Sequence, residues 1–213
     1  MTKLVLELST SLDGYVAGPD ADLENPLGVG GEQLHEWVLP TKAWREAHGL
    51  EGGAEGPESD LLSETVQRTG AVVMGRRMFS GGEGPWEDDP RANGWWGDEP
   101  PFRQSVFVVT HHAREPLTLG ETTFVFLTEG VEAAVEQARA AAGAKDVSLA
   151  GGADVAQQAL RAGLVDEVRL HVAPVFLGAG VRLFEGLPAG LRLVPTEASA
   201  SPAVTHLTYR AAN

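Results

Sequence analysis

The chain has 213 residues, no cysteine, and 30 acidic against 16 basic residues, which gives a formal net charge of −14 at pH 7. This length suits a single domain with a sizeable core. The hydrophobic fraction of 43 % and the charged fraction of 22 % are ordinary for a globular protein and exclude wholesale disorder. The missing cysteine excludes disulfide frameworks, thiolate metal sites and cysteine nucleophiles.

The distribution of charge and hydropathy narrows the choice of partners. Residues 1–107 hold 19 of the 30 acidic residues but only 8 of the 16 basic ones. A surface this acidic repels polyphosphate chains, so we expect no nucleic-acid partner. The first apolar run carries Glu7 and has no basic leader, and no run approaches the roughly 20 apolar residues that cross a bilayer. We therefore expect a cytoplasmic protein that binds no membrane.

The first part of the chain predicts strands and short helices separated by glycine-rich turns. The expected elements are a strand over 3–9, a helix over 32–48 interrupted at Pro40, a helix over 60–68, and a buried strand over 71–75. The pattern predicts Ser59 or Asp60 as the N-cap of the third element and Gly70 as its stop.

Residues 80–101 are rich in Gly, Pro and Asp, which predicts a long loop. The loop contains three of the five tryptophans, Trp86, Trp95 and Trp96, and large aromatic side chains favour burial over disorder. These tryptophans either cover a substrate ring and exclude water or bury against a second copy of the chain. We favour the second role for at least one of them and expect a homodimer.

Strands and helices alternate in the rest of the chain. The pattern predicts strands over 105–110, 123–127, 146–149 and 167–172, helices over 131–142 and 153–162, and two final strands over 191–196 and 204–210. Alternation of this kind indicates an α/β fold with a mostly parallel sheet, and two consecutive strands at the end indicate an antiparallel edge. No internal repeat is visible, so we expect one domain over 1–213.

Three predicted strands end in residues suited to bind an anion, at the edge where parallel sheets bind ligands. Paired arginines are forked phosphate donors, and a glycine turn into a helix offers free N–H groups. Each feature alone is more often a plain turn or a solvated pair, but their recurrence favours a cofactor with a pyrophosphate and an additional phosphate, such as NADPH. The three segments are Gly75-Arg76-Arg77, Thr110-His111-His112-Ala113-Arg114 and Gly151-Gly152-Ala153-Asp154.

Four segments resemble the dihydrofolate reductase superfamily, and within it the branch that contains the reductase domain of bacterial riboflavin biosynthesis. They are residues 11–14 (Ser-Leu-Asp-Gly), 72–79, 149–152 and 163–178. The resemblance covers residues 3–210, apart from apparent insertions at about 40–58 and 80–104.

This resemblance implies a dihydrofolate-reductase-like three-layer fold around a mostly parallel sheet of about eight strands. It also implies an NADPH-dependent oxidoreductase that passes hydride to a CH–NH, C=O or C=N group of a small pterin-, pyrimidine- or flavin-like substrate. Ala17 and Gly18 would then lie beside the nicotinamide. The phosphates and the adenosine ribose would meet Gly75, Arg76, Arg77, Thr110, His111, His112, Gly151, Gly152, Ala153, Asp154 and Val155.

Two positions depart from the riboflavin enzymes, which have a lysine at the position of Glu7 and an acid at that of Ala150. An acid at position 7 would repel a phosphorylated substrate, which argues against reduction of a riboflavin precursor. A catalytically inactive NADP(H)-binding protein with the same fold is the alternative.

Asp60 and Asp13 are the candidate catalytic acids. Asp60 would serve as a buried carboxyl of raised pKa, or would only cap a helix. Asp13 would bind substrate, or would only hold the turn before Gly14.

Leu12, Asp13, Trp86 and His171 are the expected substrate contacts, although a structural histidine bonded beside the core is the more common role for a residue placed like His171. Adjacent side chains such as His111 and His112 point to opposite faces of an extended segment, so we expect no metal site.

Overall fold

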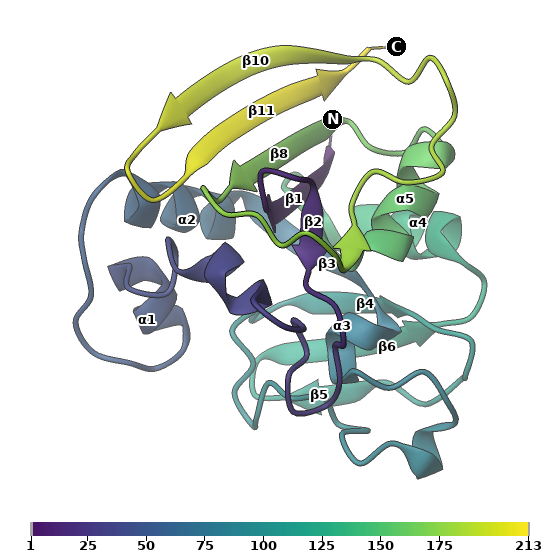
Figure 1. Cartoon of the computed structure of the whole chain (residues 1–213). Helices are drawn as coiled ribbons and strands as arrows, with labels where there is room; N and C mark the ends of the chain where they lie inside the picture. Colours follow the sequence, from purple (N-terminus) through teal and green to yellow (C-terminus); the bar gives the residue numbers. More distant parts are fainter. Residues whose placement is uncertain (1, 213) are drawn as a thin grey trace.

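A computed structural model, which describes residues 2–212, contains one nine-stranded sheet in the order β10-β11-β8-β1-β7-β3-β4-β6-β5 (Figure 1). The six strands from β8 to β6 run parallel, and both edges are antiparallel. The strands are β1 (Leu4–Thr10), β3 (Thr69–Gly75), β4 (Ser105–Val109), β5 (Leu117–Leu119), β6 (Thr122–Leu127), β7 (Asp146–Gly151), β8 (Glu167–Val172), β10 (Leu193–Ala200) and β11 (Thr205–Ala211). A small second sheet pairs β2 (Tyr15–Ala17) with β9 (Val181–Arg182).

Helices cover both faces of the large sheet (Figure 1). Helices α4 (Val131–Ala142) and α5 (Ala153–Arg161) pack on one face, where Leu4 and Leu6 of β1 are fully buried. Because strand side chains alternate, Glu7 and Ser9 point to the other face. That face carries α2 (Pro57–Arg68), α1 (Lys42–Ala47) and the 3₁₀ helix η1 (Gly31–His35).

Residues 80–104 cover the part of that second face that α2 leaves bare. A cluster of buried apolar residues combines side chains of β3, β4 and β6 with Phe79, which follows β3 in the chain. Phe79 and Phe124 have no solvent contact. Trp86 packs against it with its ring centroid 4.8 Å from that of Phe126, and Trp96 packs 4.9 Å from Phe102. Two of the three loop tryptophans, both half-buried, thus pack against their own chain.

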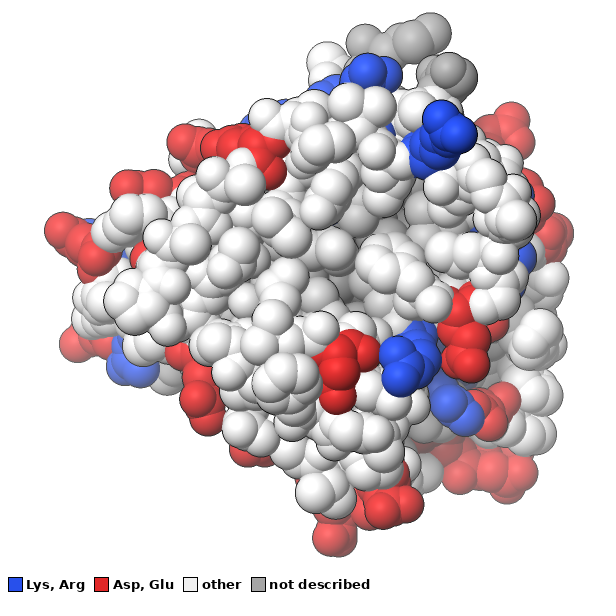
Figure 2. All heavy atoms as spheres, turned by 45° about the horizontal axis from the view of Figure 1, so that its top comes forward, with Lys and Arg blue, Asp and Glu red and all other residues white. Residues whose placement is uncertain are grey.

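Charged side chains are unevenly spread over the surface. Figure 2 brings the top of Figure 1 forward and shows that the middle of this face is hollowed and occupied by uncharged residues, with most carboxylates toward its rim. Within residues 2–212, no helix combines the length and the apolar composition needed to cross a membrane.

The mixed α/β fold with a mostly parallel sheet and an antiparallel C-terminal edge is confirmed, with one strand more than the eight expected. The additional edge strand β5 is three residues long and pairs with β6, too short for a periodicity to reveal it. Other short elements missed from the sequence are β2, β9, α3 (Arg76–Ser80) and η2 (Trp86–Asp88).

Two helix predictions need correction. The helix expected from residue 60 begins at Pro57, which occupies its first turn, so Gly56 stands at the N-cap and neither Ser59 nor Asp60 caps it. Gly70 lies inside β3 and is not the helix stop. The interrupted helix over 32–48 consists of η1 and α1, with Thr41 as the N-cap of α1, accepting a hydrogen bond from the Trp44 N–H.

Candidate active site

Three helices begin at the edge where the parallel strands end. Helices α3, α4 and α5 follow β3, β6 and β7, and the residues at their N-caps are Gly75, Gly130 and Gly152. None of these glycines can provide a side-chain cap, so the first N–H groups of each helix are left for water or a ligand. This edge therefore offers backbone donors together with the positive end of the helix dipole.

The end of β3 lies against the turn from β7 into α5. A Cβ atom at Gly75 would lie 2.9 Å from Cγ2 of Val155 and 3.7 Å from the backbone N of Gly152. Gly151 is buried with a φ of 107°, which favours glycine, whereas Gly152 is exposed with nothing within 4 Å of its missing Cβ. The N-terminus of α5 is thus open to an incoming phosphate group, and this cradle fits the pyrophosphate of a dinucleotide.

The remaining two predicted phosphate contacts on α5 differ in exposure. Ala153 is buried, whereas Asp154 is exposed and accepts a hydrogen bond from Gln158 Nε2 at 2.6 Å. Any contact from these two residues to a phosphate would therefore come from their backbone N–H groups.

The two adjacent arginines have different environments. The Arg76 side chain is only 7 % exposed, and its NH2 lies 2.6 Å from Asp89 Oδ2. Its NH1 donates a hydrogen bond to Ser80 Oγ, and its guanidinium carbon lies 3.5 Å from the ring centroid of Trp86. Arg77 is 71 % exposed and pairs with Glu83. Of the two, only Arg77 presents its guanidinium to solvent, while Arg76 anchors the 80–104 segment.

The end of β4 is closed by this same segment. Oγ1 of the buried Thr110 accepts a hydrogen bond from the His112 N–H at 3.2 Å, and the His112 carbonyl accepts one from Trp86 Nε1 at 2.7 Å. His111 is exposed. A cavity of about 270 Å³ lies nearby within the segment, lined by Leu23, Gly81, Gly82, Glu83, Gly84, Pro85, Asp88, Asp89 and Pro90.

The structure does not bring Trp86 and His171, two of the expected substrate contacts, together. His171 lies on β8, and Trp86 packs at the end of β4, four strands away in the sheet order. At the usual strand spacing this separation is about 19 Å.

Backbone segments pack closely around the predicted nicotinamide contacts. A Cβ atom at Gly18 would lie 2.0 Å from the carbonyl oxygen of Val29, and one at Gly180 would lie 2.1 Å from that of Ala17. The N-terminus of η1 joins them, since a Cβ atom at Gly31 would lie 3.3 Å from the backbone N of Gly18. The 3₁₀ helix is thus seated between Ala17–Gly18 and β1.

The structure places the two candidate catalytic acids, Asp60 and Asp13, in different surroundings. Asp60 is exposed on α2. Asp13 accepts hydrogen bonds from the N–H groups of Gly178 at 2.8 Å and Leu177 at 3.2 Å. A hydrogen bond from Ser11, together with these two, lowers the pKa of Asp13 to about 2, so its carboxyl is ionised near neutral pH. Asp13 holds the 174–180 segment against the β1–β2 turn, and Leu12 beside it is 55 % exposed.

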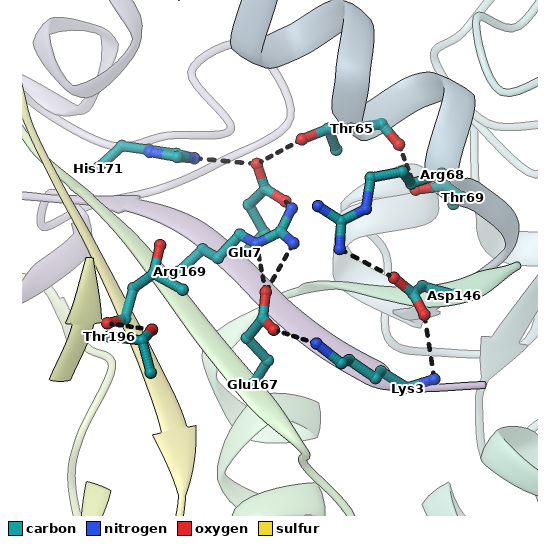
Figure 3. A network of polar contacts seen from close by, with 11 residues as sticks. Lys3, Glu7, Thr65, Arg68, Thr69, Asp146, Glu167, Arg169, His171 and Thr196 are labelled. Atoms are coloured by element: carbon teal, nitrogen blue, oxygen red, sulfur yellow. Dashed lines mark hydrogen bonds and ion pairs between the residues drawn. The ribbon is translucent and has the colours of Figure 1, made fainter. Parts of the chain in front are cut away.

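A polar network occupies the sheet face beneath α2 (Figure 3). Glu7 Oε1 accepts hydrogen bonds from Thr65 Oγ1 at 3.2 Å and, at 3.1 Å, from His171 Nε2, while its Oε2 lies 3.4 Å from Arg169 NH1. Burial acts to raise the pKa of Glu7, but His171, Arg169 and Thr65 outweigh it and lower that pKa. Arg169 and Lys3 each also pair with Glu167, at 2.6 and 2.7 Å.

The network continues into a pair of histidines. Nδ1 of His171 lies 2.8 Å from Nδ1 of His206 on β11, so one ring donates and the other accepts. Trp37 packs against both rings, with centroid distances of 4.7 and 5.1 Å, and its Nε1 donates to Ser9 Oγ at 3.0 Å. His171 is thus a buried histidine bonded at both nitrogens.

The sequence showed only part of this network. The alternation of Glu7, Arg169 and His171 along two strands was visible, but their partners Thr65, Trp37 and His206 come from a helix, a loop and the last strand, with no motif that joins them. Among the described residues, no group of three or more His, Asp or Glu side chains is arranged to hold a metal ion.

Comparison with known proteins shows the family and the fold. A family model described as the RibD C-terminal domain matches residues 2–207. No protein of curated function matches the chain.

Solved structures under 25 % identical support the fold alone. A Shewanella sp. PV-4 protein described as belonging to riboflavin biosynthesis has 21 % identity and a TM-score of 0.61, with all of both chains covered. The riboflavin biosynthesis reductase of Saccharomyces cerevisiae has 14 % identity and a TM-score of 0.54 over 100 % of this chain and 89 % of that one. Enterococcus faecalis dihydrofolate reductase, solved with NADP(H), has 14 % identity and a TM-score of 0.51 over 99 % and 97 %.

Proposed function

The chain belongs to the RibD C-terminal domain family, and from this premise we propose that it is an NADPH-dependent reductase of a small heteroaromatic or conjugated substrate. In such a reaction NADPH supplies the hydride, and the protein supplies binding, orientation and a proton. The family relatives named as reductases and the dihydrofolate reductase solved with NADP(H) support this class of reaction.

The observation that carries the proposal is the uncapped N-terminus of α5 behind Gly152. Its backbone donors lie at the carboxyl edge of the sheet, packed beside Gly75 at the end of β3. Such a terminus binds a phosphate through N–H groups and the helix dipole. The exposed Arg77 is the nearest side chain in sequence that could add a charge-assisted contact to the extra phosphate of NADPH.

The polar network beneath α2 supports an uncharged substrate ring over a phosphorylated one. Glu7 carries a negative charge on this face, and its neighbours Arg169 and Lys3 are each already paired with a carboxylate. A phosphate would therefore find no lysine at position 7 and no unpaired cation among these residues, so this face offers it no charge-assisted contact.

Cofactor binding tests the first half of the proposal. We expect NADPH to quench tryptophan fluorescence at lower concentration than NADH does. Replacing the exposed Arg77 by Ala should reduce this preference about tenfold, the usual worth of one charged contact to a phosphate. Arg103→Ala is the matched control, because Arg103 is another exposed arginine, 65 % exposed and paired with Glu121 at the opposite side of the 80–104 segment. Equal loss in both variants would contradict the assignment of Arg77.

Turnover tests the second half. Pterins, flavins, quinones and unphosphorylated aminopyrimidines should be screened for oxidation of NADPH, followed by its absorbance at 340 nm. We expect at least one uncharged ring to be reduced, and a phosphorylated aminopyrimidine to react more slowly than its unphosphorylated counterpart. Tight NADPH binding with no acceptor in any class would refute the reductase.

A further inference from the structure

The sheet face on the side of α5 is bare over the last three strands, β8, β11 and β10. Helices α4 and α5 pack on β3, β4 and β7, and β10 at the end of the sheet packs mainly on β11. Every residue of β10 after Leu193 is exposed, and all seven residues of β11 are half-buried or exposed. Figure 1 shows these two strands arching over the top of the molecule, away from α4 and α5. This part of the face is open to water or to a partner.

The strand register decides which residues occupy the bare face. Leu6 of β1 belongs to the core beneath α4 and α5, and it pairs with Val168 of β8, which in turn pairs with Tyr209 of β11. Paired residues of neighbouring strands point to the same face, and every second residue along each strand follows them. The accessible side chains on this face include Leu170, Val172, Leu207, Tyr209, Pro195 and Ala198.

The bare face carries no charge. Strands β8, β10 and β11 are described over their whole length, and none of the residues that they place on this face is charged. Their charged side chains lie on the other face, where Glu167 and Arg169 join the polar network beneath α2. A sheet with one solvated face normally turns its polar residues to water and its apolar residues to a cover. Here the uncharged face is the one that lacks a helix, so it needs a cover from outside the chain.

We propose that a second copy of this chain is that cover, with β8, β11 and β10 of two copies packed face to face about a two-fold axis. Each copy has a formal net charge of −14, so two copies repel each other wherever their carboxylates meet. In the view that brings the β10–β11 hairpin forward, uncharged residues fill the middle and most carboxylates lie toward the rim (Figure 2). The bare face is therefore where two copies can approach most closely, whereas a basic partner would find no acid on it. This inference does not depend on the proposed reductase function.

The contact uses the face of the hairpin rather than the free edge of β10. Pro195 has no backbone N–H to offer a neighbouring strand, and a bulge between Pro195 and Glu197 interrupts the strand. Both features protect an edge from pairing with another chain. Sheets packed face to face bury their side chains against each other, and a two-fold axis lets the same patch serve in both copies.

The size of the bare face sets the expected affinity. Tyr209 and Leu193 already contact the core at one end, so the free part is centred on Leu207. Three strands and six residues of strand length span about 14 by 20 Å, a flat area of roughly 300 Å². The exposed Phe184 enlarges it, on a segment that Gln157 and Arg161 of α5 hold through the carbonyls of residues 183 and 185. A standard interface buries about 800 Å² on each partner, so we expect a reversible dimer with a micromolar Kd.

The average mass from sedimentation equilibrium tests the proposal. From about 1 to about 300 μM, a range that brackets a micromolar Kd, this mass should rise from 22.5 kDa toward twice that value. Leu207→Lys places like charges at the centre of the contact and should raise the Kd about 100-fold. A wild-type protein that keeps the monomer mass throughout would overturn the proposal and leave the face to a partner of another sequence.

Val66→Lys is the matched control, because Val66 is 54 % exposed on α2, at the opposite face, and its Kd should equal that of the wild type. Ala198 is exposed, so it tests the face without burying a charge in the fold. Ala198→Asp and Ala198→Lys should each be monomeric alone, and their equimolar mixture should dimerise again because opposite charges then meet. Dimerisation of either variant alone with the wild-type Kd would overturn the assignment of the face. A dimer that survives Leu207→Lys but is lost in Trp95→Ala would overturn it too, and would place the contact on the 80–104 segment.

Discussion

The buried ion pair between Arg76 and Asp89 predicts a large and specific loss of stability in Asp89→Asn. The two side chains are 7 % and 3 % exposed, and Asp89 also accepts hydrogen bonds from Ser80 Oγ and the Arg91 N–H. Burial acts to raise the pKa of Asp89, but these donors and the Arg76 charge lower it, so the carboxylate is charged at neutral pH. Asparagine would leave Arg76 buried without a counter-charge, which costs about 3–5 kcal/mol.

For a domain of this length, that loss corresponds to a fall in Tm of roughly 6–20 °C. Urea denaturation at pH 7, followed by far-UV circular dichroism, measures the change in the free energy of unfolding. Glu83→Gln is the matched control, because Glu83 pairs with the neighbouring Arg77 at the surface, where both side chains are more than 60 % exposed. Exposed pairs contribute about 0–1 kcal/mol. Equal losses in the two variants would refute the reasoning.

A double variant then separates structure from cofactor binding at Arg76. Arg76→Met with Asp89→Leu replaces the pair by apolar residues, which should recover most of the stability lost in Asp89→Asn. Because the Arg76 guanidinium is already held by Asp89 and Ser80, we expect NADPH affinity to stay within about threefold of the wild type. A tenfold or greater loss in a folded double variant would mean that Arg76 contacts a phosphate.

Three further substitutions test other parts of the molecule. Asp13→Asn should lower Tm by the same amount at pH 5 and pH 8. The reason is that a carboxyl of pKa about 2 stabilises the fold fully above its unfolded pKa of 3.8 and loses that effect only as pH falls through 2. A difference in Tm that grew between pH 5 and pH 8 would contradict this. Gly75→Ala should lower the free energy of unfolding by about 1–3 kcal/mol in urea denaturation, because its Cβ would lie 2.9 Å from Val155 Cγ2. Gly84→Ala is the control and should leave this free energy unchanged, because its Cβ would lie in open space. Trp37→Phe should cost about 1 kcal/mol in the same assay through the lost bond to Ser9.

The central strands could be predicted because their signal is local. The strand over 167–172 and the helix over 131–142 have the bounds expected from periodicity alone, since each is long enough to show one. Elements of two to five residues, such as β5, β9 and α3, carry too few side chains to show a period. They exist because a neighbouring strand or turn holds them.

The glycines at the ends of β3 and β7 were also readable from the sequence as the starts of helices with free N–H groups, because this feature is local and needs no partner from elsewhere in the chain. The surroundings of Asp60 and Asp13 were not readable, since burial and hydrogen-bond partners depend on distant parts of the chain. Asp60 lies on the exposed side of a helix that starts three residues earlier than its capping pattern suggested. Asp13 accepts hydrogen bonds from the N–H groups of residues 177 and 178, more than 160 positions away in the chain. Neither fact follows from the residues beside them.

An acidic protein can still bind an anion at this edge, because the charges there cancel in pairs. Asp89 is neutralised by Arg76 and Glu83 by Arg77, so the acidic 80–104 segment adds little net charge at the end of β3. The remaining acids act through water, where salt screens them beyond about 8–10 Å. The donors of α5 are backbone N–H groups, whose partial charge does not titrate and is not offset by the global −14. The proposed pyrophosphate site therefore depends on local geometry rather than on the sign of the whole protein.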